Sequence, residues 1–451
     1  MKKVLLITDH KWRDLAGYVY LKFILEKNYG IKVRLCRLGE ERFWVYHEKP
    51  DLVIYNHLYE DRKVQFARWL KKQKVGVIIL PTEGIPYEKV QDLAAGKFTD
   101  LSPVDLYLSW NEPMAQRIID LGKLPPEKIK VIGVPRFDFY FPPLTRLLPS
   151  KEEIQKQYGL RVKADAPIIL YATNYTVASF KDNRSFLYKD WETLKLNKVD
   201  GYKAEQTENL IKWDTVSRDL TIDSVRRLLR DLPDIQVIYK PHPSENHSFY
   251  HYIIKELKEQ FPERFAFVVQ EYIWNLLNIA DVLLQRTCTT AIEAWIFGKP
   301  TLELHLHPQE FYFSKEHACG SDIVYNYEDV KKRIAYYAGG GSIAESMQTY
   351  RSDFLKKWCH TLDGKRTADA ASSITQFLQV QEKTNYSFSA EEFFSSYPKE
   401  YLKQLIRYGR LFIWKRILGQ DKIGRIDKQF VRKDMESWKH SILSINNIHG
   451  R

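Results

Sequence analysis

The sequence predicts an α/β protein of two consecutive domains, each built around a parallel β-sheet, followed by a helical extension. The chain has 451 residues, which is too long for one ordinary core. Short apolar runs alternate with segments of helical spacing, the pattern of βαβ units, and this series occurs twice. We place a first domain at 1–143, a linker at 144–164, a second domain at 165–380 and a basic amphipathic helical tail at 381–451.

The first series contains six apolar runs of the length of buried strands, with helical segments between them. The segment after the first run places Leu15, Val19 and Phe23 on one helical face. The expected strands are residues 3–7, 32–35, 51–55, 75–80, 106–109 and 129–132.

The second series repeats this alternation of strands and helices from Pro167 onward. Its expected strands are 167–171, 236–239, 265–269, 282–284 and 301–304, and its expected helices are 224–230, 251–260, 273–279 and 290–297. Gly298 and Pro300 end the last of these helices. Residues 181–215 are polar and weakly patterned, which is typical of a long insertion near a site.

Composition excludes several classes of protein. Hydrophobic residues make up 44% and charged residues 28%, as in folded soluble proteins. The four cysteines show no paired spacing, so neither a zinc cluster nor a disulfide framework is expected. The apolar run at the start is too short for a signal peptide, and no segment has the length of a membrane span. We therefore expect a cytoplasmic location.

The basic excess is concentrated in the tail. Residues 401–451 hold 12 Lys and Arg against four Asp and Glu, so they carry +8 of the net charge of +12. A nucleic-acid binder would spread its charge over a basic face, so no nucleic-acid partner is expected. Residues 401–418 have the spacing of an amphipathic helix, and segment 401–439 suits an anionic membrane surface at the inner face of the cell membrane. The alternative is a helix that packs on the protein.

The most informative motif follows the expected strand at 236–239. There Lys240 and His242 lie in Tyr239-Lys240-Pro241-His242-Pro243, and ligands of open α/β sheets bind at the edge where strands pass into helices. Lys240 is suited to neutralising phosphate charge, and His242 to donating a hydrogen bond or a proton to a leaving group. The alternative is that His242 caps a strand while Lys240 is solvated.

A second motif, Arg286-Thr287-Cys288-Thr289-Thr290, follows the strand at 282–284. Thr287, Thr289 and Thr290 offer hydroxyl groups beside a helix start, which attracts anions, and Arg286 adds positive charge. Glu293 fits either a capping box with Thr290 or a contact to a ribose hydroxyl. Thr173 and Asn174 follow the strand at 167–171 and are expected at the same edge.

The first domain offers carboxylates after its own strands. Glu83 lies in Pro81-Thr82-Glu83-Gly84, after the strand at 75–80, and Asp14 follows the first strand. Either could act as the base on an acceptor hydroxyl, with Glu83 as the first candidate. Each could instead serve as an N-cap or an ion-pair partner. Neither a GxGxxG motif nor a Walker loop occurs, which favours one ligand clamped between two Rossmann-like domains.

These residues resemble the GT-B glycosyltransferases, and among them the bacterial surface carbohydrate biosynthesis proteins, over roughly residues 1–380. The markers are Lys240-Pro241-His242-Pro243, the segment from Thr287 to Pro300, Pro81-Thr82-Glu83-Gly84 and Asp363-Gly364. Similar His-Pro and Ser/Thr motifs occur in polysialyltransferases and Kdo transferases, which use CMP-activated sugar acids, and in teichoic-acid glycerophosphotransferases, which use CDP-glycerol. The resemblance implies that His242 and Thr289 or Thr290 contact the nucleotide phosphate. Arg286-Thr287-Cys288 departs from the more usual serine-rich run.

The resemblance implies a GT-B fold, with the two domains facing across a cleft, and a glycosyltransferase. The expected donor is a nucleotide-sugar, with CMP-linked sugars favoured, and the expected acceptor is a surface glycan or a lipid-linked molecule. Neither a cofactor nor a metal is expected, since the sequence has no Asp-x-Asp motif. The alternatives are a CDP-glycerol or CDP-ribitol polyol-phosphate transferase, a UDP-GlcNAc 2-epimerase-like enzyme and a non-catalytic nucleotide-sugar-binding scaffold.

Overall fold

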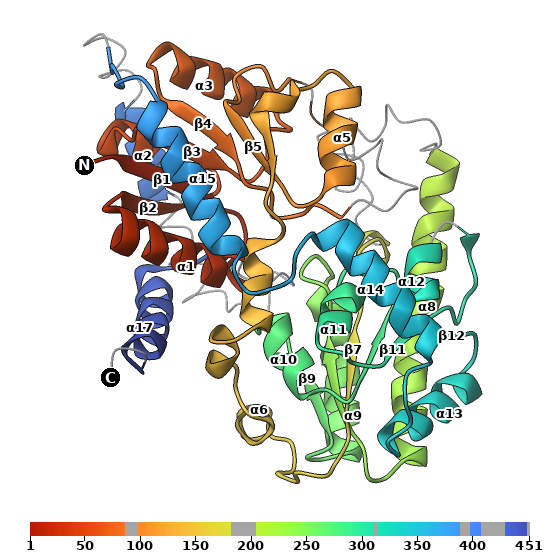
Figure 1. The fold of residues 1–451 in the computed structure, drawn as a ribbon. Coiled ribbons are helices and arrows are strands. Elements are labelled where there is room, and N and C mark those ends of the chain that lie inside the picture. The colour runs from red at the N-terminus through yellow and green to blue at the C-terminus, as the bar shows by residue number, and fades with distance from the viewer. Residues whose placement is uncertain are drawn as a thin grey trace. The chain divides into compact units, whose positions relative to one another are not determined.

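Two parallel β-sheets organise the computed structural model, which describes residues 1–85, 98, 100–181, 204–310, 314–387, 397–406 and 429–448 (Figure 1). The chain divides into two units. The first comprises Met1–Leu147 together with the described residues from Lys356 onward, and the second comprises Leu148–Leu355. Each unit is described by itself below.

The first sheet has the order β2-β1-β3-β4-β5-β6, and all its strand pairs are parallel. The six strands expected in this domain are all present, with ends that shift by one or two residues. They are β1 (Lys3–Thr8), β2 (Lys32–Arg37), β3 (Leu52–Tyr55), β4 (Gly76–Ile79), β5 (Leu106–Ser109) and β6 (Ile129–Val131).

Helices cover both faces of the first sheet. On one face α1 (Lys11–Tyr29) lies beside α15 (Arg366–Val380) and α17 (Arg432–Ile448), and Figure 1 shows α15 running across the sheet next to α1. On the other face lie α2 (Glu41–Glu48), α3 (Asp61–Lys72) and α5 (Glu112–Asp120). Such two-sided burial explains why the strands are apolar without alternation.

The second sheet has the order β12-β11-β10-β7-β8-β9 and is also parallel. The five expected strands are present, and the sequence reading missed only β12, a strand of three residues at one edge. The strands are β7 (Ile168–Ala172), β8 (Gln236–Lys240), β9 (Phe265–Phe267), β10 (Val282–Gln285), β11 (Thr301–Leu304) and β12 (Asp322–Val324).

The structure contains three helices that the sequence reading did not predict, α12 (Lys315–Cys319), α13 (Tyr327–Ala338) and α14 (Glu345–Cys359), and it extends one that was predicted. The expected helix at 224–230 is the end of a much longer one, because residues 204–215, read as insertion, are helical too. Residues 182–203 of that insertion lie outside the described residues. The helices are α6 (Lys151–Tyr158), α8 (Ala204–Asp231), α9 (His251–Gln260), α10 (Ile273–Ile279), α11 (Thr290–Ile296), α12 (Lys315–Cys319), α13 (Tyr327–Ala338) and α14 (Glu345–Cys359).

Short 3-10 helices complete the described chain. They are η2 (Pro126–Lys128), η3 (Pro135–Tyr140), η4 (Leu144–Leu147), η5 (Ala178–Phe180) and η7 (His247–Tyr250). Among the described residues, no helix combines the length and apolarity needed to cross a membrane.

The chain returns to the first unit near its end, and this differs from the boundary placed at residue 380. Helix α15 packs on α1 and buries Ala370, Ala371 and Ile374 in the core of the first unit, although the sequence reading assigned it to the second domain. Sequence spacing cannot reveal this contact, because the apolar face of α15 would fit either sheet. The linker segment is likewise ordered, since α6 buries Ile154 within the second unit.

Part of the basic tail also packs on the first unit. Ile442 of α17 is buried in the core beside α1, and Met435 and Trp438 pack against that core. Lys11 of α1 forms an ion pair with Asp434 at 2.9 Å. Residues 407–428, which include most of the expected amphipathic helix, lie outside the described residues.

Asp138 anchors the returning chain, so we predict that Asp138→Ala destabilises the first unit. The buried carboxylate accepts hydrogen bonds from the backbone nitrogens of Arg366 (3.0 Å) and Thr367 (2.7 Å) at the start of α15. Its removal leaves two buried N–H groups unsatisfied and should lower the free energy of unfolding by about 2–4 kcal/mol, measured by chemical denaturation. The matched control Asp369→Ala removes only a half-exposed ion pair and should cost less than about 1 kcal/mol. Equal effects of the two changes would contradict this role.

Candidate functional site

The strongest site candidate lies at the carboxyl edge of the second sheet. From β7 the chain continues to β8 and β9 on one side, while β10 pairs with the other side of β7. Such a reversal of strand order is where ligands bind in open α/β sheets. The register places Lys240, Ala172 and Gln285 side by side at the ends of β8, β7 and β10, and Glu303 of β11 continues this row.

Lys240 is held inside this edge. Its ammonium donates to the carbonyl oxygen of Val269 at 3.2 Å, and the residue is 9% exposed. Burial lowers the pKa of Lys240 from 10.5 to about 8. The side chain therefore carries its positive charge at neutral pH, which suits a group that meets an anionic ligand. It loses this charge in mildly alkaline solution.

His242 is fixed in position and tautomer by its own loop. Its backbone nitrogen donates to the Glu245 carboxylate at 3.0 Å, and its ring Nδ1 accepts from the backbone nitrogen of Ser244 at 3.1 Å. Because Nδ1 is an acceptor, the neutral imidazole carries its hydrogen on Nε2. The residue is half-buried at the sheet edge, and Nε2–H is the donor of its neutral ring.

Glu245 joins the loops after β7 and β8, and the sequence reading missed it. This carboxylate is 1% exposed and accepts from the Thr173 hydroxyl (2.8 Å), from the Tyr175 backbone nitrogen (3.0 Å), from His242 and from the Tyr250 hydroxyl. Burial raises the pKa of Glu245 while these donors oppose the rise. The only sequence signal for Glu245 is its place in the loop after β8, three residues beyond His242.

Arg286 points into the domain. Its guanidinium forms a buried ion pair with Asp214 of α8, donates to the Asn174 carbonyl oxygen at 2.7 Å and stacks on the Tyr175 ring at 4.5 Å. The charge predicted to face a donor is therefore neutralised by Asp214, which is 0% exposed. Asn174 contributes its backbone to this contact. The sequence reading missed Asp214 because it lies in the region assigned to an insertion.

The hydroxyl motif begins with a strained turn at Thr287. This residue has a φ of 44°, a left-handed conformation that β-branched residues rarely adopt and that costs about 1–3 kcal/mol. Glu303 holds the turn, since its carboxylate accepts from the Thr287 nitrogen (2.7 Å) and hydroxyl (3.0 Å). Gln285 completes the arrangement by donating to Glu303 and accepting from the Cys288 nitrogen at 2.7 Å. The sequence reading missed Glu303 as well.

The rest of the motif starts α11. Thr289 is the exposed N-cap residue, and its hydroxyl makes no capping hydrogen bond within the described chain. The Thr290 hydroxyl lies 3.1 Å from Cys288 Sγ. Glu293 is buried in the first turn of the helix. The capping box that Thr290 and Glu293 would form is not present, because the N-cap is Thr289.

The structure thus brings together part of the predicted donor set. Lys240, His242, Thr173 and the turn from Thr287 to Thr290 share one sheet edge, whereas Arg286 and Asn174 brace that edge from within. Within the described ranges, no group of three or more His, Cys, Asp or Glu side chains has the geometry to hold a metal ion.

The first unit holds the two predicted base candidates around one arginine. Arg13 binds Glu83 at 2.6 Å, Asp14 at 2.8 Å and Asp9 at 2.9 Å. The Glu83 side chain is 80% exposed, whereas that of Asp14 is 1% exposed and also accepts from the His10 backbone nitrogen at 3.0 Å. Burial raises the pKa of Asp14, and Arg13 opposes the rise. Of the two, Glu83 is the carboxylate that an acceptor can reach.

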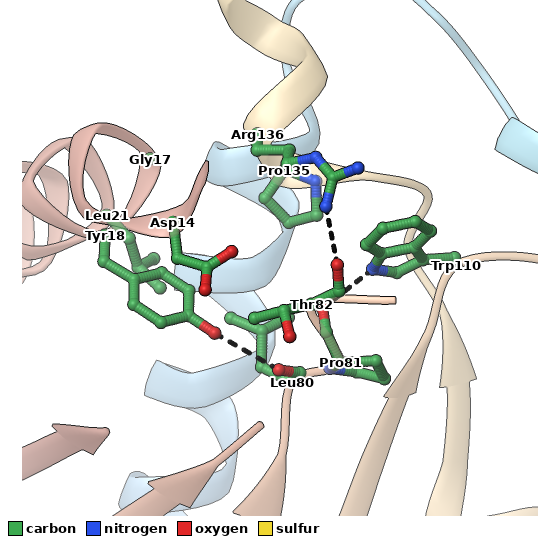
Figure 2. A pocket seen from close by; sticks show the side chains of 10 residues that line it. All are labelled: Asp14, Gly17, Tyr18, Leu21, Leu80, Pro81, Thr82, Trp110, Pro135 and Arg136. Carbon is green, nitrogen blue, oxygen red and sulfur yellow. Dashed lines mark hydrogen bonds between the residues drawn. The ribbon is translucent and has the colours of Figure 1, made fainter. Parts of the chain in front are cut away.

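Asp14 instead faces a small cavity of about 20 Å³, which Figure 2 shows from close by. The walls are tied by hydrogen bonds: the Trp110 indole donates to the Pro81 carbonyl oxygen at 3.0 Å, and Arg136 donates to that of Thr82 at 2.5 Å. The cavity has room for about one water molecule. It is therefore too small for a substrate. The hydrogen bonds in its walls hold the loop that carries Glu83.

Three polar residues outside the predicted set of site residues lie at the ends of β1 and β3. Thr8 and Asn56 are 1% and 3% exposed, and the Thr8 hydroxyl and both Asn56 amide atoms have no hydrogen-bond partner among the described residues. The same holds for Nδ1 of His57, whose pKa burial lowers to about 4. Unsatisfied buried polar groups are costly, and here they lie at the carboxyl ends of two neighbouring strands of the first sheet. The signal that could have found them is the one that selected Lys240, polar residues directly after an apolar run.

Glu303 gives a pH prediction for the second unit. Burial raises its pKa from 4.5 to about 7, so this group stabilises the fold below about pH 4.5 and the contribution is lost as the pH rises through about 7. Between about pH 4 and pH 8 the free energy of unfolding of the wild type should fall by about 3 kcal/mol more than that of Glu303→Gln, which does not titrate. Denaturation curves at both pH values measure the difference. The same pH dependence in both proteins would contradict the assignment.

Comparison with solved structures identifies the fold class. The wall teichoic acid polymerase TagF matches with a TM-score of 0.53 and 14% identity, over 84% of this chain and 89% of that one. A protein from Listeria monocytogenes described as a UDP-N-acetylglucosamine 2-epimerase matches with a TM-score of 0.52 and 13% identity, over 86% of this chain and 100% of that one. The UDP-GlcNAc 2-epimerase of Methanocaldococcus jannaschii matches with a TM-score of 0.51 and 11% identity, over 83% of this chain and 100% of that one.

A scan against protein-family models and a search of the curated proteins found no match. At this level of identity the structural likeness is one of fold. It confirms the class predicted from the sequence, an α/β protein of two Rossmann-like domains of the GT-B type with a helical part at the C-terminal end.

Proposed function

We propose that this protein is a glycosyltransferase that moves a sugar from a nucleotide donor to a hydroxyl group of a surface glycan or a lipid-linked acceptor. The observation that carries the proposal is the row at the carboxyl edge of the second sheet, where Lys240, His242 and the turn from Thr287 to Thr289 lie next to the reversal of strand order. This is the position at which α/β sheets bind phosphate-bearing ligands.

In the proposed reaction the second domain binds the donor. The Lys240 ammonium and the Nε2–H of His242 meet the donor phosphate, whose negative charge grows as the bond to the sugar breaks. Donors that are already in position cost no reorganisation at that moment. His242 is held in this way, since its backbone nitrogen donates to Glu245 and its ring Nδ1 accepts from the Ser244 nitrogen. Thr289, with its exposed hydroxyl, adds a further donor to the phosphate.

The acceptor chemistry is assigned to the first domain. Glu83 accepts the proton of the acceptor hydroxyl, and Arg13 orients its carboxylate. Asp14 has the structural role of joining the helix start at His10 to Arg13. The polar groups of Thr8 and Asn56 suit a ligand rich in hydroxyl groups.

The nucleotide of the donor is a finer point of the proposal. We favour a CMP-activated sugar acid, on the resemblance of the His-Pro motif. Two alternatives are supported by likeness of fold: a TagF structure was soaked with CDPG, and the epimerase of Methanocaldococcus jannaschii was crystallised with UDP-GlcNAc and UDP. A CDP-linked polyol-phosphate transferase and a UDP-sugar epimerase therefore remain the competing candidates.

A thermal-shift panel of CMP, CDP, UDP and GDP tests the donor. Because a ligand stabilises the state that binds it, CMP should raise the melting temperature of the wild type more than the other three nucleotides do. Lys240→Met, which removes the ammonium, should lose most of this shift, while Lys258→Met, in α9 of the same unit, should keep it. Stabilisation by UDP alone or CDP alone would refute the CMP donor in favour of the corresponding alternative.

Turnover of the donor distinguishes an enzyme from a non-catalytic scaffold. His242→Ala should lower the turnover by about 10²–10³-fold, and His251→Ala should not change it.

Glu83→Gln tests the base. With saturating donor the variant should show a kcat lower by about 10²–10⁴-fold, because the amide cannot accept the proton, while the thermal shift by the nucleotide stays unchanged. Glu112→Gln, an exposed glutamate at the start of α5, is the matched control and should keep the wild-type kcat. A wild-type kcat in Glu83→Gln would exclude Glu83 as the base.

A further inference from the structure

A second polar cavity lies in the first unit, on the side of the sheet opposite to α1. It has a volume of about 370 Å³ and is lined by the starts of α2 and α3 and by the helix at 397–406. This is the size of a site for a small molecule, roughly twenty times that of the cavity beside Asp14. The proposed transferase function makes no use of it.

The walls of this cavity are predominantly basic. Arg42, Arg62, Lys63 and Lys403 line it, against the two carboxylates Glu41 and Glu400. Lys63 is paired with Glu60 at 2.7 Å and Lys403 with Glu400 at 2.6 Å. Neither Arg42 nor Arg62 forms an ion pair with any residue that the structure describes. Two guanidinium groups are therefore available to one anion, and stacking on the Phe66 ring at 4.8 Å holds that of Arg42 against the wall.

Two helix starts border the cavity and add the partial positive charge of their free N–H groups, although their first turns also carry the acidic residues Glu41 and Asp61. Glu41 is the first residue of α2, while Arg62 and Lys63 belong to the first turn of α3, and all three line the cavity. The N-cap residues Glu40 and Glu60 make no side-chain capping bond in the described chain. First-turn N–H groups and the helix dipole both favour an anion, and phosphate is the anion most often bound in this way.

Buried acceptors indicate what accompanies the anion. Glu41 and Gln404 are both 6% exposed, and one oxygen of each side chain, Oε2 and Oε1 respectively, has no hydrogen-bond partner among the described residues. Such oxygens need donors, which a bare phosphate lacks and neighbouring hydroxyl groups supply. The wall chemistry therefore fits a phosphate that carries hydroxyl groups close by.

The helix at 397–406 indicates that a bilayer is the source of this ligand. On the surface of the molecule, beside the cavity that Lys403 and Gln404 line, the same helix exposes Leu402 (56%), Leu405 (51%) and Ile406 (49%). Adjacent exposed aliphatic side chains among lysines are typical of helices that lie in the interface of a bilayer. The net charge of +8 on residues 401–451 adds attraction to an anionic surface.

We propose that this cavity binds the phosphate headgroup of an anionic, hydroxyl-bearing membrane lipid, while Leu402, Leu405 and Ile406 enter the acyl boundary of the same leaflet. Arg42 and Arg62 bind the phosphate, and Glu41 and Gln404 accept from the headgroup hydroxyls. The inference does not depend on the identity of the donor or on the proposed transfer reaction, since it concerns other residues and a ligand that is not consumed.

Co-sedimentation of the full chain with vesicles tests this site. Vesicles that contain phosphatidylglycerol should bind the wild type, those of phosphatidylcholine alone should not, and vesicles with equally charged phosphatidylserine should bind more weakly. The double variant Arg42→Ala/Arg62→Ala should bind phosphatidylglycerol vesicles about 30-fold more weakly. Arg161→Ala/Lys163→Ala removes the same charge from exposed positions of the second unit and should bind like the wild type.

Two further variants separate the parts of the site. Leu405→Asp should weaken binding to vesicles without changing the binding of soluble glycerol 1-phosphate, measured by calorimetry. Gln404→Leu should reduce the preference for phosphatidylglycerol over phosphatidylserine. The proposal is overturned if Arg42→Ala/Arg62→Ala binds vesicles like the wild type, if neutral vesicles bind equally well, or if glycerol 1-phosphate binds while no vesicle does. Equal binding of the two anionic lipids by the wild type would overturn recognition of the hydroxyl groups.

Discussion

The proposed donor site depends on one buried carboxylate, that of Glu245. Its two oxygens accept hydrogen bonds from the loops after β7 and β8 and from the Tyr250 hydroxyl. A buried carboxylate is stable only when it is satisfied in this way, so the four donors and Glu245 have to keep their positions together. His242 is one of these donors through its backbone, so Glu245 holds the segment of the loop that carries the His242 ring.

Two other buried carboxylates apply the same principle to the neighbouring loop. Asp214 holds Arg286, and Glu303 holds Thr287 in a left-handed conformation that the residue would otherwise avoid. Strain of this kind persists where the surrounding structure fixes it, and it is concentrated at functional sites. Buried carboxylates thus hold the loops at the edge of the second sheet, and the proposed binding of a phosphate depends on such preorganisation.

The sequence predicts the strands and the residues that directly follow them because both depend on local pattern. An apolar run followed by polar residues locates a strand and its carboxyl end, and this is enough to place Lys240, His242 and the turn at Thr287 on one edge. The parts it cannot predict are contacts between distant segments. The pairing of Arg286 with Asp214, the support of Thr287 by Glu303 and the return of α15 to the first unit all join residues that lie 16 or more positions apart. The inward direction of Arg286 follows from the first of these contacts, so its charge was assigned to the ligand when the structure assigns it to the interior.

A crystal structure of the full chain with bound CMP tests the central claim most directly. The account predicts a phosphate oxygen within hydrogen-bond distance of His242 Nε2, with Lys240 and the hydroxyl of Thr289 close to the same phosphate. A nucleotide bound away from the carboxyl ends of β7, β8 and β10, for example in the basic cavity beside Arg42 and Arg62, would contradict it.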